Sequence, residues 1–263
     1  MPTQDKWVTY AKEHKKEFLE RIIPTPLPDK EDRIAYLTAG GPGSGKSEFR
    51  EAVLPSKEQV CIIDPDEFRQ FFPGYNGKNA TDYQHAASYL VDYCFGKLIR
   101  KKLPMVLDST FGSRRALQNI QRLLDHDFTV KLFYVYEHPQ AAWDFAQHRS
   151  RKVPREAFER TLAHAYDNIS AAWDEYHDNE QFKLYLFNQQ EHAFNRCTPR
   201  QQLDTLAKAI KEVWSMPEDI QQIIAKYGDI GDVIDHGTPA EKQCVSNYAF
   251  EKVAQLKREH MEH

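Results

Sequence analysis

The chain has 263 residues, of which 41% are hydrophobic, 12% aromatic and 28% charged. This composition is ordinary for a folded globular protein and excludes a chain that stays disordered. The formal net charge of −4 argues against a strongly basic surface for nucleic acid, although an acidic protein can still carry a local basic patch.

The sequence carries no sign of membrane insertion or secretion. No apolar run approaches the roughly 18 residues that a bilayer-spanning helix needs, and the N-terminal residues lack the apolar stretch of a secretory signal. The four cysteines are far apart in the sequence and form no CxxC pair that would hold a metal: Cys61, Cys94, Cys197 and Cys244. We therefore expect reduced thiols in the core of a cytoplasmic protein that has no membrane partner.

Short apolar runs alternate with helical patterns between residue 33 and about residue 188. Strands are predicted at residues 34–37, 60–63, 105–107, 130–136 and 182–187. Helices are predicted at residues 5–22, 46–53, 139–149 and 155–176, with a long helix capped by Thr81 and another that begins at Ser113 or Arg114. This alternation predicts a three-layer α/β fold, in which helices cover both faces of a mainly parallel sheet.

Two other parts flank the predicted α/β core. Residues 1–30 comprise a helix and a proline-rich linker, and residues 31–190 comprise the α/β core itself. From residue 191 to residue 263 the pattern is helical only, with helices at roughly 199–213, 217–227 and 239–260. We expect these last helices to form a helical appendage on the core.

The segment Gly40–Ser47 reads GGPGSGKS and fits the phosphate-loop pattern GxxxxGK[ST]. Glycines allow the backbone amides to face the phosphates, and the helix that follows places its N-terminus beneath the anion. Lys46 then contacts the β- and γ-phosphates, and the hydroxyl of Ser47 binds Mg²⁺. The residues expected to hold ATP or GTP are Gly41, Pro42, Gly43, Ser44, Gly45, Lys46, Ser47 and Glu48.

Acidic side chains follow two of the predicted strands, at the edge of the sheet where ligands bind. Asp108 ends one strand and is expected to bind Mg²⁺ beside the acceptor, the alternative being an ordinary strand-end turn. Asp66 follows another strand and is expected to be the base that takes the proton of an acceptor hydroxyl. Its alternative role is to start the helix at Pro65, for which Asp64 is a candidate cap.

The segment HRSRKVPRE carries several cations. Arg149 and Arg151 are expected to neutralise charge on the transferring phosphoryl group from a mobile loop, because Pro154 would end the preceding helix. The alternative is a solvated cationic turn. After the third predicted strand, Thr110 and Arg114 are expected to contact the acceptor, with Arg114 suited to an anionic one.

Taken in this order, the motifs resemble those of the zeta-toxin family of P-loop kinases over about residues 33–170. The family motif DxDxF is matched by Asp64, Asp66 and Phe68. The resemblance implies that Asp66 is the catalytic base and that Lys46 is the phosphate-binding lysine. It also implies a three-layer fold similar to that of small-molecule and nucleotide kinases.

The resemblance extends to the acceptor side with two departures. The strand-end Glu-x-Thr of the family is represented here by Asp108 and Thr110, so the carboxylate is set back by about one methylene. The arginines that hold the nucleotide phosphates in the family correspond to Arg151 and Arg149, in a segment that is compressed relative to the family.

Well-studied zeta toxins phosphorylate UDP-N-acetylglucosamine at the 3′-hydroxyl of its sugar, and an antitoxin helix that covers the nucleotide site commonly holds them silent. The resemblance therefore implies an ATP- or GTP-dependent kinase with Mg²⁺, a nucleotide-sugar acceptor and an antitoxin partner. It also raises the hypothesis that the helix at residues 5–22 inhibits the enzyme in cis, the alternative being a helix that packs on the edge of the sheet.

Two other functions stay open. Related kinases of polynucleotide 5′-ends also carry Asp-x-Thr at this strand, and such an enzyme would need a basic, aromatic-lined groove for a single strand. A nucleotide-dependent binding module would need no acceptor base, so a requirement for Asp66 in phosphotransfer distinguishes it from either kinase.

Overall fold

A computed structural model of the chain describes residues 2–28, 33–148, 153–189, 193–197, 218–227, 233–234 and 236–248. The chain forms two compact units, Met1–Asp204 and Thr205–His263. The first unit carries the sheet and the phosphate loop. Two residues of the predicted site, Arg149 and Arg151, lie outside the described residues.

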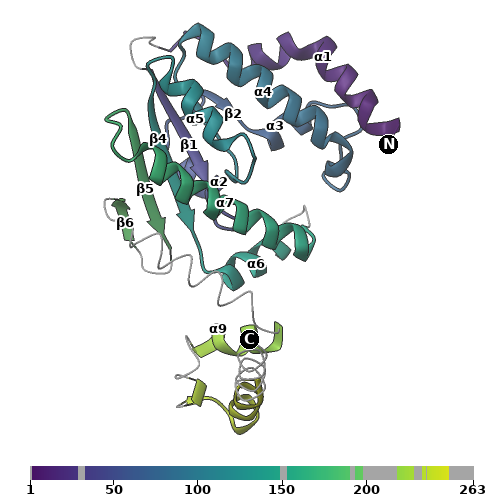
Figure 1. The fold of residues 1–263 in the computed structure, drawn as a ribbon. Coiled ribbons are helices and arrows are strands. Elements are labelled where there is room, and N and C mark those ends of the chain that lie inside the picture. Colours follow the sequence, from purple (N-terminus) through teal and green to yellow (C-terminus); the bar gives the residue numbers. More distant parts are fainter. Residues whose placement is uncertain are drawn as a thin grey trace, which may run out of the picture. The chain divides into compact units, whose positions relative to one another are not determined.

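One sheet runs through the first unit (Figure 1). Its strands are β1 (Ile34–Ala39), β2 (Cys61–Ile63), β3 (Met105–Leu107), β4 (Thr129–Tyr136), β5 (Phe182–Asn188) and β6 (Ala193–Arg196). The helices of this unit are α1 (Pro2–Ile22), α2 (Lys46–Val53), α3 (Pro65–Gln70), α4 (Gln84–Lys101), α5 (Ala116–Leu124), α6 (Pro139–His148) and α7 (Arg155–Tyr176), with a 3₁₀ turn, η1, at Ala80–Tyr83. Every residue of β2 and β3 is buried, as continuous apolar runs between two layers of helices require.

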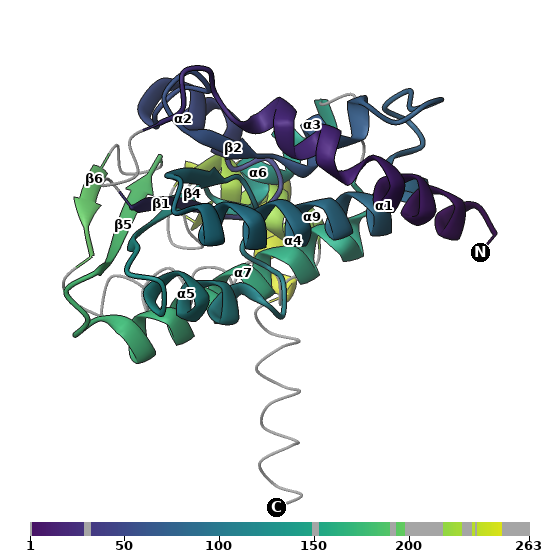
Figure 2. The ribbon, with the colours of Figure 1, turned by 90° about the horizontal axis from the view of Figure 1, so that it is seen from above.

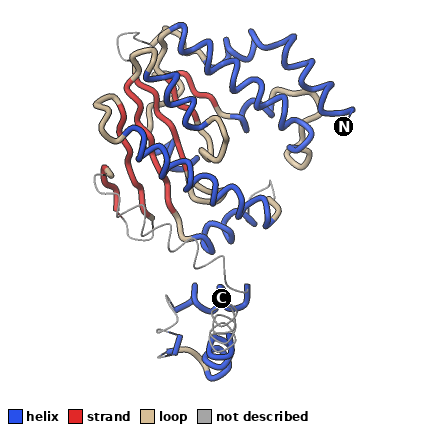
Figure 3. Tube along the Cα trace, in the orientation of Figure 1, coloured by secondary structure: helices blue, strands red, loops and turns tan. Residues whose placement is uncertain are grey.

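The strands, red in Figure 3, follow the order β2-β3-β1-β4-β5-β6. The first five run parallel, and β6 runs antiparallel at the edge. β1 lies between two partners, because Leu37 pairs with Leu107 of β3 and with Leu132 of β4. Parallel strands end at the same edge of a sheet, so the segments that follow β1, β2 and β3 meet there. The predicted three-layer α/β fold is confirmed.

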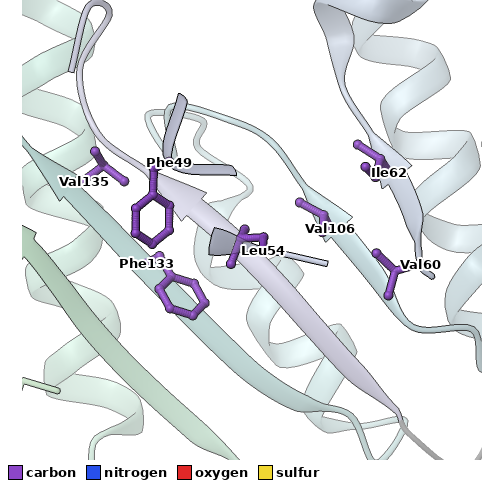
Figure 4. Packing of buried hydrophobic residues seen from close by; sticks show 7 residues of the cluster. All are labelled: Phe49, Leu54, Val60, Ile62, Val106, Phe133 and Val135. Atoms are coloured by element: carbon purple, nitrogen blue, oxygen red, sulfur yellow. The ribbon is translucent and has the colours of Figure 1, made fainter. Parts of the chain in front are cut away.

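Helices cover the sheet from both sides: α4, α5 and α7 lie on one face, and α2 lies on the other (Figure 1, Figure 2). On the α2 side, Phe49 and Leu54 pack over side chains of the strands (Figure 4). The buried residues of this cluster are Phe49, Leu54, Val60, Ile62, Val106, Phe133 and Val135. Burial of this apolar area fixes α2, the helix that follows the phosphate loop, to strands β3 and β4 on either side of β1.

The N-terminal helix α1 packs along α4 and next to the edge strand β2. Its Trp7 stacks on Tyr83 of η1, with ring centroids 4.7 Å apart. Further along the helix, Phe18 contacts Phe68 of α3 and Phe72 just after α3, with ring centroids 5.9 and 5.4 Å apart. The N-terminal helix therefore packs at the edge of the sheet, which is the alternative to inhibition in cis that the sequence left open.

Two details differ from the sequence prediction. Thr81 does not cap the long helix, because a 3₁₀ turn precedes it: Thr81 lies inside η1, and Tyr83 occupies the N-cap position of α4. The strand β6 is not among the predicted strands. It continues the sheet beyond residue 190 by pairing with β5, where Phe194 lies opposite Phe187. Four residues with two apolar side chains show no period of their own, so only the partner strand defines them.

The second unit has a small apolar core of its own. Its helix α9 (Glu218–Tyr227) contributes Ile220, which is buried together with Val233 and Val245. A further helix is described up to residue 248, whereas the predicted helix at 199–213 lies outside the described residues. No helix in the described part of the chain combines the length and the hydropathy of a bilayer span.

We expect Phe18→Ala to lower the free energy of unfolding by about 3 kcal/mol, because it removes a buried ring from the aromatic cluster beneath α1. Leu27→Ala is the control: Leu27 is 60% exposed, and its truncation should change the free energy by less than about 0.5 kcal/mol. Equilibrium unfolding in urea measures both. Equal free energies of unfolding for the two variants would contradict the packing role of α1.

Candidate active site

The phosphate loop joins the end of β1 to the start of α2. The backbone N–H of Gly40 donates to the carbonyl oxygen of Thr110 at 3.2 Å, which ties the loop to the segment after β3. The φ angles of Gly40, Gly43 and Gly45 are 142°, 76° and 78°, in the region that residues with a side chain rarely adopt. α2 then begins directly at Lys46. The glycines of the motif are therefore required by the backbone path.

The loop has the donors of an anion cradle. Among the described residues, the backbone N–H groups of Gly43, Gly45 and Ser47 donate to no protein acceptor. They lie at the N-terminus of α2, where the helix dipole favours negative charge. The ammonium group of Lys46 reaches back over the loop, 2.6 Å from the carbonyl oxygen of Gly41. These groups fit the phosphates of a nucleoside triphosphate.

Two other elements pack against the loop and hold its shape. A Cβ placed on Gly43 would lie 2.0 Å from the carbonyl oxygen of Ala142 in α6. The side-chain amide of Gln189, directly after β5, donates to the carbonyl oxygen of Ser44 at 2.5 Å. Sequence reasoning missed Gln189. The one feature of the sequence that points to Gln189 is its position, as a polar residue just after the last predicted parallel strand.

Asp64, directly after β2, caps α3. One of its carboxylate oxygens accepts the backbone N–H of Asp66 at 2.7 Å and that of Glu67 at 3.4 Å. The capping role considered for Asp64 is thereby confirmed. The cap places Asp66 in the first turn of α3, where its side chain is 58% exposed and accepts a hydrogen bond from Arg69.

Asp108 is buried directly after β3, and both of its oxygens have partners. Oδ1 accepts a hydrogen bond from the hydroxyl of Thr38 at 2.8 Å. Oδ2 forms an ion pair with Nε of Arg50 at 3.1 Å, although without the alignment of a hydrogen bond. The same guanidinium lies 4.0 Å from Asp64 and 3.9 Å from Glu67. Sequence reasoning missed Arg50, whose signal is its place one helical turn after the phosphate-loop lysine.

Burial, followed by repulsion from the carboxylate of Asp108, raises the pKa of Asp64 to about 7. Near neutral pH the Asp64 carboxyl group is therefore partly protonated. The acidic edge then carries less negative charge than its residue types suggest.

The described residues contain no group of three or more His, Cys, Asp or Glu side chains that could hold a metal ion. Mg²⁺ at nucleotide sites is usually held by one or two protein oxygens together with phosphate oxygens. The predicted ligands Ser47, in the first turn of α2, and Asp108 fit that mode. The carboxylate of Asp108 has lone pairs beyond those that face Thr38 and Arg50, so it can contact the ion directly or through water.

The other predicted site residues differ in their surroundings. Thr110 lies beside the phosphate loop, and its hydroxyl accepts the backbone N–H of Gly112 at 3.3 Å. Arg114 is exposed and pairs with no carboxylate in the described part of the chain. α7 begins at Arg155 directly after Pro154, so the predicted arginine segment joins α6 to α7.

One edge of the sheet thus combines three kinds of group. An anion cradle follows β1, an exposed carboxylate on α3 follows β2, and a buried carboxylate paired with an arginine follows β3. Such an edge can hold a triphosphate by its backbone donors and present a base to a second substrate.

We expect Gly43→Ala to weaken ATP binding by about tenfold or more, because the new Cβ would collide with the backbone of α6 and strain the loop. Gly77→Ala is the matched control: its φ is 79°, yet an added Cβ there meets no atom within 4 Å. This control should lose about 1 kcal/mol of stability and keep its ATP affinity. Calorimetric titration with ATP measures both, and equal affinities would contradict the role of the loop contact.

Asp64→Asn keeps a good helix cap and removes the titrating carboxyl group. Because the pKa of Asp64 is raised from 3.8 to about 7, the folded chain keeps a proton that the unfolded chain releases. Between about pH 4 and 7, the free energy of unfolding of the wild type should fall relative to that of D64N, by at most about 1.4 kcal/mol per pH unit. Urea denaturation in EDTA across this range measures the difference, and a difference independent of pH would contradict the shift.

Comparisons with known proteins agree with this reading of the fold. A family model described as zeta toxin matches residues 19–212. A search of curated protein sequences finds no match to the chain. Among solved structures, the chain is similar to a chain of the PezAT chromosomal toxin–antitoxin system of the human pathogen Streptococcus pneumoniae. The TM-score is 0.57 at 15% identity, and the match covers 83% of this chain and 93% of that one.

Two further similar structures contain AvrRxo1-ORF1 with AvrRxo1-ORF2. The structure with sulphate ions has a TM-score of 0.53 at 13% identity and covers 77% of this chain and 71% of that chain. The structure with ATP has a TM-score of 0.51 at 13% identity and covers 74% and 65%. At these identities the likeness is one of fold. The family match spans the phosphate loop, the acidic sheet edge and the whole sheet, and on this ground the chain belongs to the zeta toxin family.

Proposed function

We propose that this protein is a kinase that transfers the γ-phosphoryl group of ATP or GTP to a hydroxyl acceptor. Members of the zeta toxin family are P-loop kinases. The observation that carries the proposal is the exposed carboxylate of Asp66, which lies at the same sheet edge as the phosphate cradle. Transfer to a hydroxyl group needs a base in this place, whereas a module that only binds nucleotide does not.

The donor nucleotide is held by the loop between β1 and α2. The backbone N–H groups of the loop and the ammonium of Lys46 bind the β- and γ-phosphates. Mg²⁺, when bound beside Ser47 and Asp108, offsets phosphate charge. Arg50 holds the carboxylate of Asp108 in place at this edge by an ion pair. The similar AvrRxo1-ORF1 structure that contains ATP supports a nucleotide donor.

In the proposed reaction, Asp66 accepts the proton of the acceptor hydroxyl as that oxygen forms a bond to the γ-phosphorus. The bond from the γ-phosphorus to the bridging oxygen breaks, and its electrons stay on the released nucleoside diphosphate. Arg149 and Arg151, which lie outside the described residues, are proposed to offset charge on the transferring group.

We propose a nucleotide sugar, such as UDP-N-acetylglucosamine, as the acceptor. Asp108, Thr110 and Arg114 follow β3, which lies in the sheet between β1 and β2, the strands that precede the phosphate loop and Asp66. Arg114 is exposed and pairs with no carboxylate among the described residues, so it can bind a diphosphate. The support for the sugar itself is the family resemblance.

The proposed protein partner is an antitoxin that silences the kinase. One similar structure comes from a toxin–antitoxin system, PezAT. Another is a complex of two proteins, AvrRxo1-ORF1 with AvrRxo1-ORF2. Both share the fold with this chain. A partner that covers the phosphate loop would exclude the donor nucleotide and so prevent transfer.

The test is to incubate the protein with ATP, Mg²⁺, UDP-N-acetylglucosamine, pooled metabolites and short 5′-hydroxyl oligonucleotides, and to identify the phosphorylated species by mass spectrometry. We expect the nucleotide sugar to gain a phosphoryl group. Asp66→Asn should slow transfer by about 100-fold or more and keep ATP affinity within about twofold. Asp178→Asn, at a carboxylate that is 95% exposed and far along the chain, is the control.

The outcomes separate the three functions. Full transfer by D66N would remove the proposed mechanism. Phosphorylation of the oligonucleotides alone would favour a polynucleotide kinase. ATP binding with no phosphorylated acceptor would favour a nucleotide-dependent binding module.

A further inference from the structure

The carboxylate of Asp66 rests on a buried arginine of its own helix. Arg69 lies one turn further along α3, and its Nη1 donates to Oδ1 of Asp66. The two side chains differ sharply in exposure, 2% for Arg69 against 58% for Asp66. The guanidinium therefore lies beneath the carboxylate, on the protein side, and leaves the carboxylate at the surface.

The opposite end of the guanidinium is held by a second element. Its Nη2 donates to Oε1 of Gln84 at 2.6 Å. Gln84 is the first residue of α4, directly after η1, and its amide nitrogen also donates to the hydroxyl of Ser88 at 3.3 Å. Arg69 thus bridges α3 and α4 through its two Nη atoms.

The aromatic cluster beneath α1 fixes the distance between these two elements. Phe72, just after α3, packs on Tyr83, the residue before Gln84, with ring centroids 5.4 Å apart. Phe18 of α1 contacts Phe68, the neighbour of Arg69, at 5.9 Å. Because these rings are buried, the backbone segments that carry Arg69 and Gln84 cannot move apart without disturbing the core.

Stability alone does not account for an arginine in this place. Removing a guanidinium from water is costly, and an apolar side chain of similar volume often stabilises a protein as well or better. An ion pair whose partner is largely exposed adds little to the free energy of folding. What the pair does achieve is to hold one rotamer of a largely exposed carboxylate, and a proton transfer depends on that geometry.

We propose that Arg69, anchored by Gln84, is a positioning residue that aims the carboxylate of Asp66 at the acceptor hydroxyl. This inference rests on the proposed function of Asp66 as the base. Arg69 touches neither substrate. It holds Oδ1 by a hydrogen bond and so keeps the carboxylate where it can accept the proton as the new phosphorus–oxygen bond forms.

The first test reads the position of the carboxylate and needs no acceptor. Crystal structures of the wild type and of Arg69→Met are compared at the Asp66 side chain. We expect one conformer, bonded to Arg69, in the wild type, and a shifted or divided conformer in R69M. An unchanged Asp66 conformer in R69M would overturn the proposal, whatever the reaction of the protein is.

The second test is kinetic and compares R69M, Arg69→Lys and Gln84→Leu, with UDP-N-acetylglucosamine as the acceptor probe. R69M should lower kcat by about 10- to 100-fold, leave the Kd for ATP within about twofold, and leave the urea midpoint unchanged or raised. R69K, which keeps the charge but not the planar fork, should recover part of the loss. Q84L should show a smaller fall than R69M.

Arg122→Met is the matched control, because Arg122 is a partly buried arginine of α5 that packs on Phe95 and donates to Asn119. It should change stability without changing kcat. Wild-type kcat in R69M together with an inactive D66N would overturn the positioning role and leave the proposed function intact. Full activity of D66N would instead remove the proposed function itself.

Discussion

The parallel pairing of β1 with both β3 and β4 is the constraint on which the rest of the site depends. Leu37 pairs with Leu107 on one side and with Leu132 on the other, which places β1 inside the sheet. Its carboxyl end must then turn away through the glycine loop, beside the ends of β2 and β3. This pairing brings together the phosphate cradle and the acidic residues that follow two other strands. Interactions between residues that are close in the sequence would not do so.

Concentrating carboxylates at one edge requires cations to compensate them, and the structure places two arginines for this purpose. Arg50 of α2 pairs with the buried Asp108, and Arg69 of α3 pairs with the exposed Asp66. Asp64 lies 4.0 Å from Arg50, and its pKa rises to about 7 because it is buried and because the carboxylate of Asp108 lies nearby. The two carboxylates proposed to act in the reaction are those that have a close arginine.

The features that the sequence predicted are those with a local cause. The glycine positions of the phosphate loop follow from the backbone conformations that only glycine adopts readily, as Gly45 shows with φ of 78°. Capping by Asp64 involves the backbone of residues two and three positions later. The five parallel strands are apolar runs whose length and turn residues indicate burial. Thr81 marks the limit of this reasoning, because a 3₁₀ turn absorbs the residue that was expected to cap α4.

The sequence by itself therefore determined the three-layer fold, the phosphate loop and the acidic strand ends, since each depends on neighbours in the chain. Only the tertiary structure decided which side chains hold the phosphate loop and the acidic residues in place. Gln189 reaches Ser44 across 145 positions, and Arg50 reaches Asp108 from a different element. The strand β6 likewise exists through its partner β5. The physical reason is that a hydrogen bond or ion pair between distant residues leaves no period or motif in the sequence, because strand order and helix packing alone bring its atoms together.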